Sequence, residues 1–343
     1  MKRFFCACEQ EVFLNNAYCE KCGRDLIYDP TAKTMWSGEL TDNNFIAHDS
    51  TTNQQTAIQF KPCSNRHSSI FCNWAVAKEH DQQCICCQTT RIIPDQTQPK
   101  NSQRWRALER AKRQLFTTLI DLNLPIENYI EKPGGLAFDF LEDQRSNPNV
   151  SIEHVLTGHH QGTITLNAAE ADEGFLHTMK EEMGENYRTI LGHFRHEVGH
   201  YYWDILIQDN NQLAAFRELF GDERQDYNQA LESYYQQARP EFRSSQFITP
   251  YASSHPHEDW AETWAHYLHI VDTLETAVSY GLSAYEPKIN DFDDWFSEWA
   301  RVKQVMNALN RSMGLPDAYP FILTNIVRKK LQFIDQLIDD YTK

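Results

Sequence analysis

Hydrophobic side chains recur at helical spacing along most of the chain after residue 100, and this period predicts amphipathic helices. The first begins near Ser102, a residue suited to capping a helix, and ends before Pro125, which interrupts one. Its apolar stripe consists of Trp105, Leu108, Leu115, Leu119 and Leu122. Further helices are predicted, to within a few residues at each end, at 186–207, 211–220, 226–238, 257–280, 291–312 and 320–341.

Two short segments between the first and second predicted helices alternate apolar and polar side chains, which is the period of a β-strand. They are LAFDF at 136–140 and GTITLN at 162–167, and we expect GTITLN to lie at the edge of a small sheet. A few strands followed by many helices predict an α+β domain.

The first 95 residues differ from the rest, because they are poor in helical periodicity and rich in cysteine, asparagine and turn residues. Pro94 and the polar stretch DQTQPKNSQ that follows are typical of a linker. At 343 residues the chain also exceeds the usual size of one domain. We therefore predict one domain at 1–95 and a second, mostly helical one at 104–343.

The charge balance narrows the possible partners. The formal net charge is −16, and the acidic excess lies after residue 95. Proteins that bind nucleic acid normally offer a basic face, so we expect no nucleic-acid partner. We also expect no membrane span, because the chain has no apolar run of about eighteen residues, and the start MKRFFCACEQ lacks the apolar core of a signal peptide.

All nine cysteines precede residue 88, and two sets of four can be drawn from them. The first set is Cys6, Cys8, Cys19 and Cys22, and the second is Cys63, Cys72, Cys84 and Cys87. Four thiolates close a tetrahedral structural zinc site, which stabilises a region too small and polar to fold alone. Without a secretory signal, such clusters favour a reducing compartment, so we expect a cytoplasmic protein. Cys86 is left unassigned and could replace Cys87; reduced, buried cysteines are the alternative for either set.

The segment HEVGH at 196–200 fits the motif H-E-x-x-H. Residues four apart share one face of a helix, so His196 and His200 can bind one zinc ion. Glu197, beside the first ligand, can then exchange protons with an attacking water and a leaving amine. Asp204, four residues after His200, could accept the other ring N–H of that histidine. The alternatives are a chance match on an amphipathic helix and, for Asp204, a solvated side chain.

A catalytic zinc ion needs a third protein ligand. The segment YASSHPHEDWAETWAHYLHIV at 251–271 offers Glu258 and Glu262, which are four apart and share a helix face. One could bind zinc while the other supports a ligand, and the spacing alone does not choose between them. Both could also be ordinary acids near a helix N-terminus.

HEVGH followed by HPHEDWAETWAHYL resembles a zinc-binding metallopeptidase family that carries an N-terminal, rubredoxin-like zinc ribbon, and the resemblance extends through FGDERQDYNQAL at 220–231. The catalytic part is also similar to gluzincins of the lethal-factor type. These show a tyrosine seven residues before the glutamate ligand and another acid four residues after it, positions occupied here by Tyr251, Glu258 and Glu262. The resemblance therefore implies Glu258 as the third zinc ligand, Tyr251 as a stabiliser of the oxyanion and Glu262 as an acid that supports a ligand. An acid at Asp204 also matches such sites.

The same family supports both cysteine sets through NWAV at 73–76 and RIIPD at 91–95. It differs at the first pair, where its spacing is C-x-x-C and this chain has C-x-C.

These observations predict a zinc-dependent metallopeptidase with a zincin-like catalytic domain, one catalytic zinc ion and up to two structural ones. The substrate would be a peptide or protein, which could pair with GTITLN as an added strand, and the ribbon could bind a protein partner. The rival prediction is an interaction module built on the zinc ribbon, with a vestigial metal domain that no longer catalyses a reaction.

Overall fold

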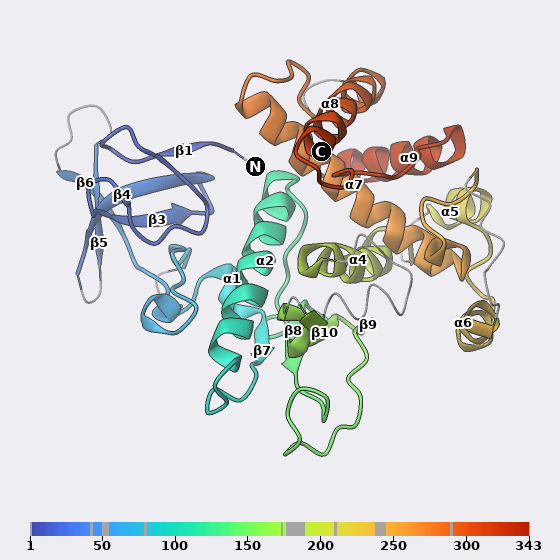
Figure 1. Ribbon diagram of the computed structural model, residues 1–343, viewed down its shortest axis with the longest axis horizontal. Coiled ribbons are helices and arrows are strands. Elements are labelled where there is room, and N and C mark those ends of the chain that lie inside the picture. The colour runs from blue at the N-terminus through green and yellow to red at the C-terminus, as the bar shows by residue number, and fades with distance from the viewer. Residues whose placement is uncertain are drawn as a thin grey trace. The chain divides into compact units, whose positions relative to one another are not determined.

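The computed structural model describes residues 2–41, 44–49, 55–78, 81–172, 174–175, 189–208, 211–236, 245–288 and 291–342. The chain divides into two compact units (Figure 1). Arg3–Phe194 form the N-terminal unit, and Arg195–Lys343 together with Met1–Lys2 form the C-terminal unit. Small sheets with cysteine clusters precede a mostly helical part with its own small sheet, so the predicted α+β class is confirmed.

The N-terminal unit begins with two antiparallel sheets that the hydrophobic pattern did not predict. The strands are β1 (Phe4–Phe5), β2 (Glu11–Val12), β3 (Asp25–Asp29), β4 (Thr34–Leu40), β5 (Phe45–His48) and β6 (Gln55–Phe60). The last four form a meander in chain order, and its core cluster includes the buried side chains of Ile27 and Phe45. Strand β3 carries a run of three buried residues and β6 carries none, so neither shows the alternation by which strands are recognised in a sequence.

A second four-stranded sheet has the order β7-β8-β10-β9. The remaining elements of the N-terminal unit are η1 (Ser64–His67), α1 (Ile85–Gln88), β7 (Thr90–Ile92), α2 (Asn101–Asp121), β8 (Ala137–Leu141), β9 (Gly158–His160), β10 (Thr163–Asn167) and η2 (Ala168–Ala171). The predicted strands at 136–140 and 162–167 are confirmed as β8 and β10. The predicted edge position of 162–167 is wrong, because β10 pairs with β8 on one side and with β9 on the other.

Helix α2 covers this sheet, with Leu108, Leu115 and Leu119 fully buried and the ring of Phe116 at 6.1 Å from that of Phe138 in β8. The helix begins at Asn101, so the expectation that Ser102 caps it is wrong, and Ser102 lies in its first turn.

The described part of the C-terminal unit consists of helices and their connections. Its elements are α4 (Ile190–Trp203), which the unit shares with the N-terminal one, the π-helical turn η3 (Asp204–Gln208), α5 (Leu213–Phe220), α6 (Tyr227–Gln236), η4 (Tyr251–Ser253), α7 (Pro256–Ser279), α8 (Phe292–Ser312) and α9 (Asn325–Thr342). These match the predicted helices, except that 320–324 is not helical. Residues 186–188 and 237–238 of the predictions lie outside the described residues.

Helix α7 organises this unit. Pro256 occupies its first turn, where a missing N–H costs nothing, and the His255 ring accepts a hydrogen bond from the backbone N–H of His257 at 3.1 Å. Its indoles Trp260 and Trp264 are fully buried, and Trp260 donates to the carbonyl oxygen of Gly199 in α4 at 2.8 Å. The two helices therefore run close together at the segment that carries HEVGH.

Gly199 permits this close approach. A Cβ atom at that position would lie 3.0 Å from the Cα of Ala261 and 3.2 Å from the side chain of Trp264. A larger residue would require these neighbours to shift, so the glycine of HEVGH suits the close approach of the two helices that carry His196, His200 and Glu258.

Candidate metal centres

Helices α4 and α7 bring His196, His200 and Glu258 together, with one ligand atom from each lying within 4.8 Å of the others. The two Nε2 atoms of the histidines are 3.3 Å apart. Glu258 Oε2 lies 3.0 Å from Nε2 of His196, and Glu258 Oε1 lies 3.6 Å from Nε2 of His200. The pair four residues apart on one helix thus meets a carboxylate from the first turn of another.

Glu262 lies on the other side of the His196 ring. Its Oε1 is 2.7 Å from Nδ1 of His196, and its Oε2 accepts a hydrogen bond from the Thr249 hydroxyl at 2.7 Å. A proton on Nδ1 satisfies this contact, which leaves the lone pair of Nε2 directed at His200 and Glu258. The two carboxylates that the sequence could not rank therefore take different positions, Glu258 at the converging nitrogens and Glu262 behind the ring.

This donor set suits a divalent cation. Burial lowers the pKa of His196, but its contacts with Glu258 and Glu262 outweigh burial and raise the pKa well above its usual value. A positive charge between the imidazoles and the buried carboxylate is therefore favourable. A zinc ion bound by two imidazoles and one carboxylate would supply that charge. Burial also raises the pKa of Glu258, yet the charge of His200 and the hydrogen bond with His196 hold that pKa well below its ordinary range.

Tyr227, at the start of α6, is a site residue that the sequence analysis missed. Its hydroxyl donates to Glu258 Oε1 at 2.6 Å, and the side chain of Glu258 is 1% exposed. The phenol thereby holds one carboxylate oxygen while the other faces His196. Tyr227 lies within FGDERQDYNQAL, which the resemblance had singled out, but no spacing rule links its position to that of Glu258.

Glu197 and Tyr251 flank the converging ligands. Glu197 is buried beside His196 on α4, and the Tyr251 ring lies 6.0 Å from the His196 ring. Burial raises the pKa of Tyr251, and the charge of Glu258 raises it further, so the phenol stays protonated and able to donate. Asp204 begins the π-helical turn that follows α4.

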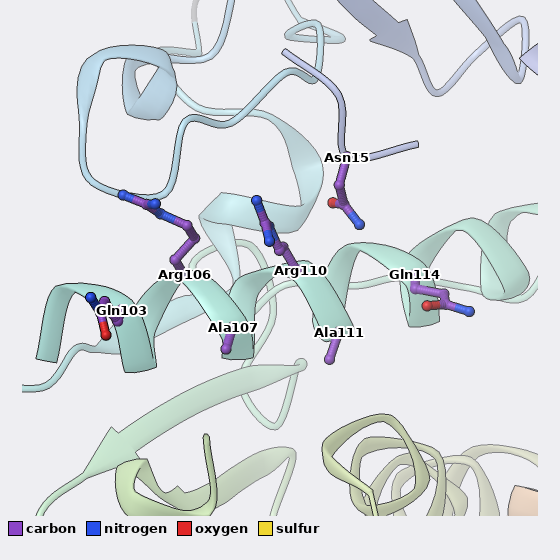
Figure 2. Close-up of a pocket in the computed structure, with 7 residues that line it drawn as sticks. All are labelled: Asn15, Gln103, Arg106, Ala107, Arg110, Ala111 and Gln114. Atoms are coloured by element: carbon purple, nitrogen blue, oxygen red, sulfur yellow. The ribbon is translucent and has the colours of Figure 1, made fainter. Parts of the chain in front are cut away.

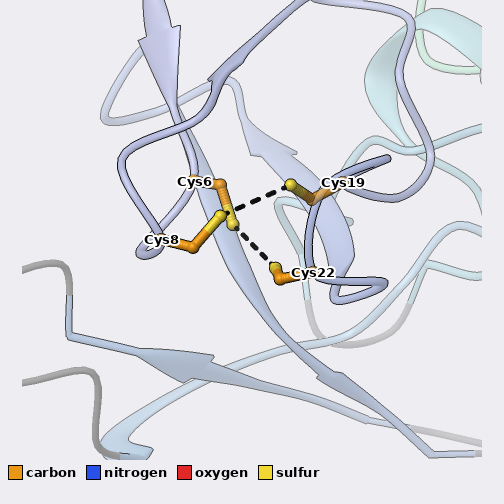
Figure 3. Close-up of side chains that lie close together, drawn as sticks. All are labelled: Cys6, Cys8, Cys19 and Cys22. Carbon is orange, nitrogen blue, oxygen red and sulfur yellow. Dashed lines mark hydrogen bonds between the residues drawn. The ribbon is translucent and has the colours of Figure 1, made fainter.

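The first cysteine cluster joins Cys6, Cys8, Cys19 and Cys22 (Figure 3). The Sγ atoms of Cys6 and Cys22 are 3.5 Å apart, and those of Cys8 and Cys19 are 3.7 Å apart. Gly23 has a φ of 77° and donates its N–H to the carbonyl of Cys19 at 2.8 Å, which closes a tight turn around the second pair. The shortened C-x-C spacing still lets all four sulfurs converge.

The second cluster joins Cys63, Cys72, Cys84 and Cys87, all of them buried. Cys72 Sγ lies 3.7 Å from the sulfurs of both Cys84 and Cys87. Cys86 stands outside this set, and burial raises the pKa of its thiol well above the ordinary value. Four sulfurs at these separations, in each cluster, fit a tetrahedral zinc ion.

None of the described helices combines the length and the apolar character needed to cross a membrane.

Comparisons with known proteins place the chain in a family. Residues 3–98 match the sequence model of a zinc-ribbon domain. Proteins of Mycobacterium bovis and of two strains of Mycobacterium tuberculosis, each described as uncharacterized, are 36% identical to the chain over 351 residues, which cover 99% of this chain and 96% of theirs. No solved structure matches the chain. Residues 101–337 match the sequence model of the family described as "putative zinc-binding metallo-peptidase", and the chain belongs to that family, with a zinc-ribbon domain before the peptidase part.

Proposed function

We propose that this chain is a zinc-dependent peptidase of the gluzincin type, with His196, His200 and Glu258 as zinc ligands and Glu197 as general base. The observation that carries the proposal is the convergence of three ligand atoms within 4.8 Å, together with the contact of Glu262 behind His196. A metal ligand histidine commonly gives its other ring N–H to a carboxylate in this way.

Each residue of the proposed site has a separate role in peptide hydrolysis. Zinc, when bound, supplies Lewis acidity and makes water a nucleophile near neutral pH. Glu197 accepts a proton from the water as the oxygen attacks the peptide carbonyl carbon, and it returns the proton to the amine nitrogen as the C–N bond breaks. The Tyr251 hydroxyl donates a hydrogen bond to the carbonyl oxygen as negative charge develops there. Asp204 accepts the other ring N–H of His200, as Glu262 accepts that of His196, and each carboxylate thereby orients its histidine.

The two cysteine clusters serve as structural zinc sites, which brings the proposed total to three zinc ions per chain. Eight thiolates in the clusters remain reduced only in a reducing compartment, which supports a cytoplasmic location. The ribbon would bind a protein partner, and the domain limits of 1–95 and 104–343 belong to the same proposal.

The test compares zinc-loaded wild type with Glu197→Gln on a library of peptides, with cleavage products mapped by mass spectrometry. Glu197→Gln removes the base but no ligand, so we expect unchanged zinc content and a loss of about 10²–10⁴-fold in turnover. Glu218→Gln, an exposed acid on α5, removes the same charge and should cleave like wild type.

Comparable turnover in Glu197→Gln would exclude Glu197 as the general base. Wild type that carries its full zinc complement and cleaves no peptide would favour the rival function, an interaction module with a vestigial metal domain.

A further inference from the structure

A groove of about 520 Å³ lies along helix α2 within the N-terminal unit (Figure 2). It is lined by Asn15, Gln103, Arg106, Ala107, Arg110, Ala111 and Gln114. Six of these belong to α2. Figure 2 shows the side chain of Asn15, from the segment between β2 and β3, directed toward α2 between Arg110 and Gln114. The size is within the range of small-molecule sites, about 300–1,000 Å³.

The polar lining consists of two guanidinium groups and three amides, and it contains no carboxylate. Arg106 is held in place, because its Nε donates to the carbonyl of Ser69 at 2.6 Å and its guanidinium lies 4.7 Å from the centre of the Phe71 ring. Arg110 is exposed and makes no hydrogen bond or ion pair with any residue that the structure describes. One arginine is therefore fixed and the other is available.

Asn15 is oriented by a third arginine. Arg113 is 1% exposed, and its Nε donates to Asn15 Oδ1 at 3.1 Å. Since the amide oxygen is engaged by this donor, the NH₂ group of Asn15 remains as a donor for the groove. Nη1 of Arg113 is buried without a hydrogen-bond partner among the described residues. Its positive charge lies behind the amide and is partly balanced by Glu109 and by Cys72, Cys86 and Cys87.

Like charges crowd here, although the chain as a whole is acidic at −16. Partial desolvation lowers the pKa of the exposed Arg110, and the charges of Arg113 and Arg106 lower it further. A bound anion would relieve this repulsion, and planar guanidinium groups bind carboxylate and phosphate oxygens in pairs.

We propose that this groove binds an oxyanion, the phosphate or carboxylate group of a small molecule, through Arg106, Arg110 and the amide of Asn15. The site is separate from the residues proposed for peptide hydrolysis, and it would stand if that function proved wrong. Arg110 supplies the main charge, Arg106 a pre-oriented second guanidinium, and the Arg113–Asn15 hydrogen bond an oriented amide donor.

The experiment is calorimetric titration of the full-length, zinc-loaded chain with inorganic phosphate and, separately, with succinate. Charged hydrogen bonds contribute about 1.5–3 kcal/mol, which corresponds to roughly 10–150-fold in affinity. We therefore expect Arg110→Gln to weaken binding at least about tenfold and Arg106→Gln to do the same. Arg110 has no hydrogen bond or ion pair with a described residue to lose, so its variant should keep the melting temperature and zinc content of wild type. Arg311→Gln, an exposed arginine of α8 paired with Asp317, is the charge-matched control.

Tighter binding of phosphate would identify the ligand as a phosphorylated compound, and tighter binding of succinate would identify a carboxylate; either supports the site. Three results would overturn it: neither probe binds at millimolar concentration, Arg110→Gln and Arg106→Gln bind as wild type does, or Arg311→Gln weakens binding as much as they do. The second result would place any bound oxyanion elsewhere, for instance at the zinc ion of the C-terminal unit.

Discussion

Substituting Glu258 and Glu262 separately tests the division of roles between the two carboxylates. In Glu258→Ala the carboxylate oxygen that lies 3.0 Å from Nε2 of His196 is lost, and with it the only anionic ligand proposed for the site. In Glu262→Ala the proposed ligands all remain, and His196 loses only the acceptor 2.7 Å from its Nδ1. The first change removes a ligand, whereas the second removes the group that orients one.

The expected magnitudes follow from these contacts. A complete set of four ligands binds structural zinc with about 10–16 kcal/mol, so an even share is about 2.5–4 kcal/mol per ligand. Glu258→Ala should therefore weaken zinc binding roughly 100–1,000-fold. Loss of a group that orients a ligand costs about 10–100-fold, which is the expectation for Glu262→Ala. Glu262→Gln keeps an acceptor oxygen for Nδ1 and should fall closer to wild type.

Competition titrations against a chromophoric zinc chelator give these affinities, with both cysteine clusters kept saturated so that one ion is titrated. Tyr227→Phe is the control for Glu258→Ala, because both remove the hydrogen bond of 2.6 Å between the two side chains but only one removes the ligand. If Glu262→Ala loses the metal while Glu258→Ala keeps it, the two roles are reversed and the alignment on lethal-factor-type sites is wrong.

Further predictions concern the phenols, a buried ion pair and the structural zinc ions. Tyr251→Phe should keep zinc and slow turnover, because the Tyr251 hydroxyl would act only as the oxyanion forms. Steady-state kinetics and a zinc assay measure this, and an unchanged kcat would contradict it. Tyr227→Phe should weaken zinc binding about 10-fold or more, as loss of a group that holds a ligand does, and chelator titration measures it. Asp259→Ala should lower the free energy of unfolding in urea by about 3–5 kcal/mol, because it removes the buried carboxylate that lies 2.5 Å from the ammonium of Lys330. The double variant Asp259→Leu with Lys330→Met leaves no buried charge and should lose less stability; an equal loss would refute the reasoning. Elemental analysis of the full chain should find three zinc ions, and Cys22→Ser should lose one of them; an unchanged zinc content would remove the first cluster from the metal sites.

The helices were largely predictable because their signal is local. An apolar stripe with a period near 3.6 residues depends only on neighbours in the chain, and α2, α7 and α8 follow it closely. The exceptions depend on distant contacts. The meander β3–β6 was not predicted, and two of its strands show why: β3 has a run of three buried residues and β6 has none, so neither alternates. The position of β10 inside its sheet depends on β9, a strand that the sequence analysis did not predict.

In the candidate site, too, features that depend on local spacing were predictable, and features that depend on distant contacts were not. The spacing of HEVGH by itself determined that His196 and His200 share a helix face, because four residues make about one turn. The grouping of eight cysteines into two sets was also readable from the chain. Only the tertiary structure decided that Glu258 meets the converging nitrogens while Glu262 lies behind the ring of His196, because both carboxylates occupy the same helix face and only the packing of α7 against α4 separates them. Tyr227 likewise reaches Glu258 from a helix 31 positions away, and a contact of that separation leaves no periodic trace in the sequence.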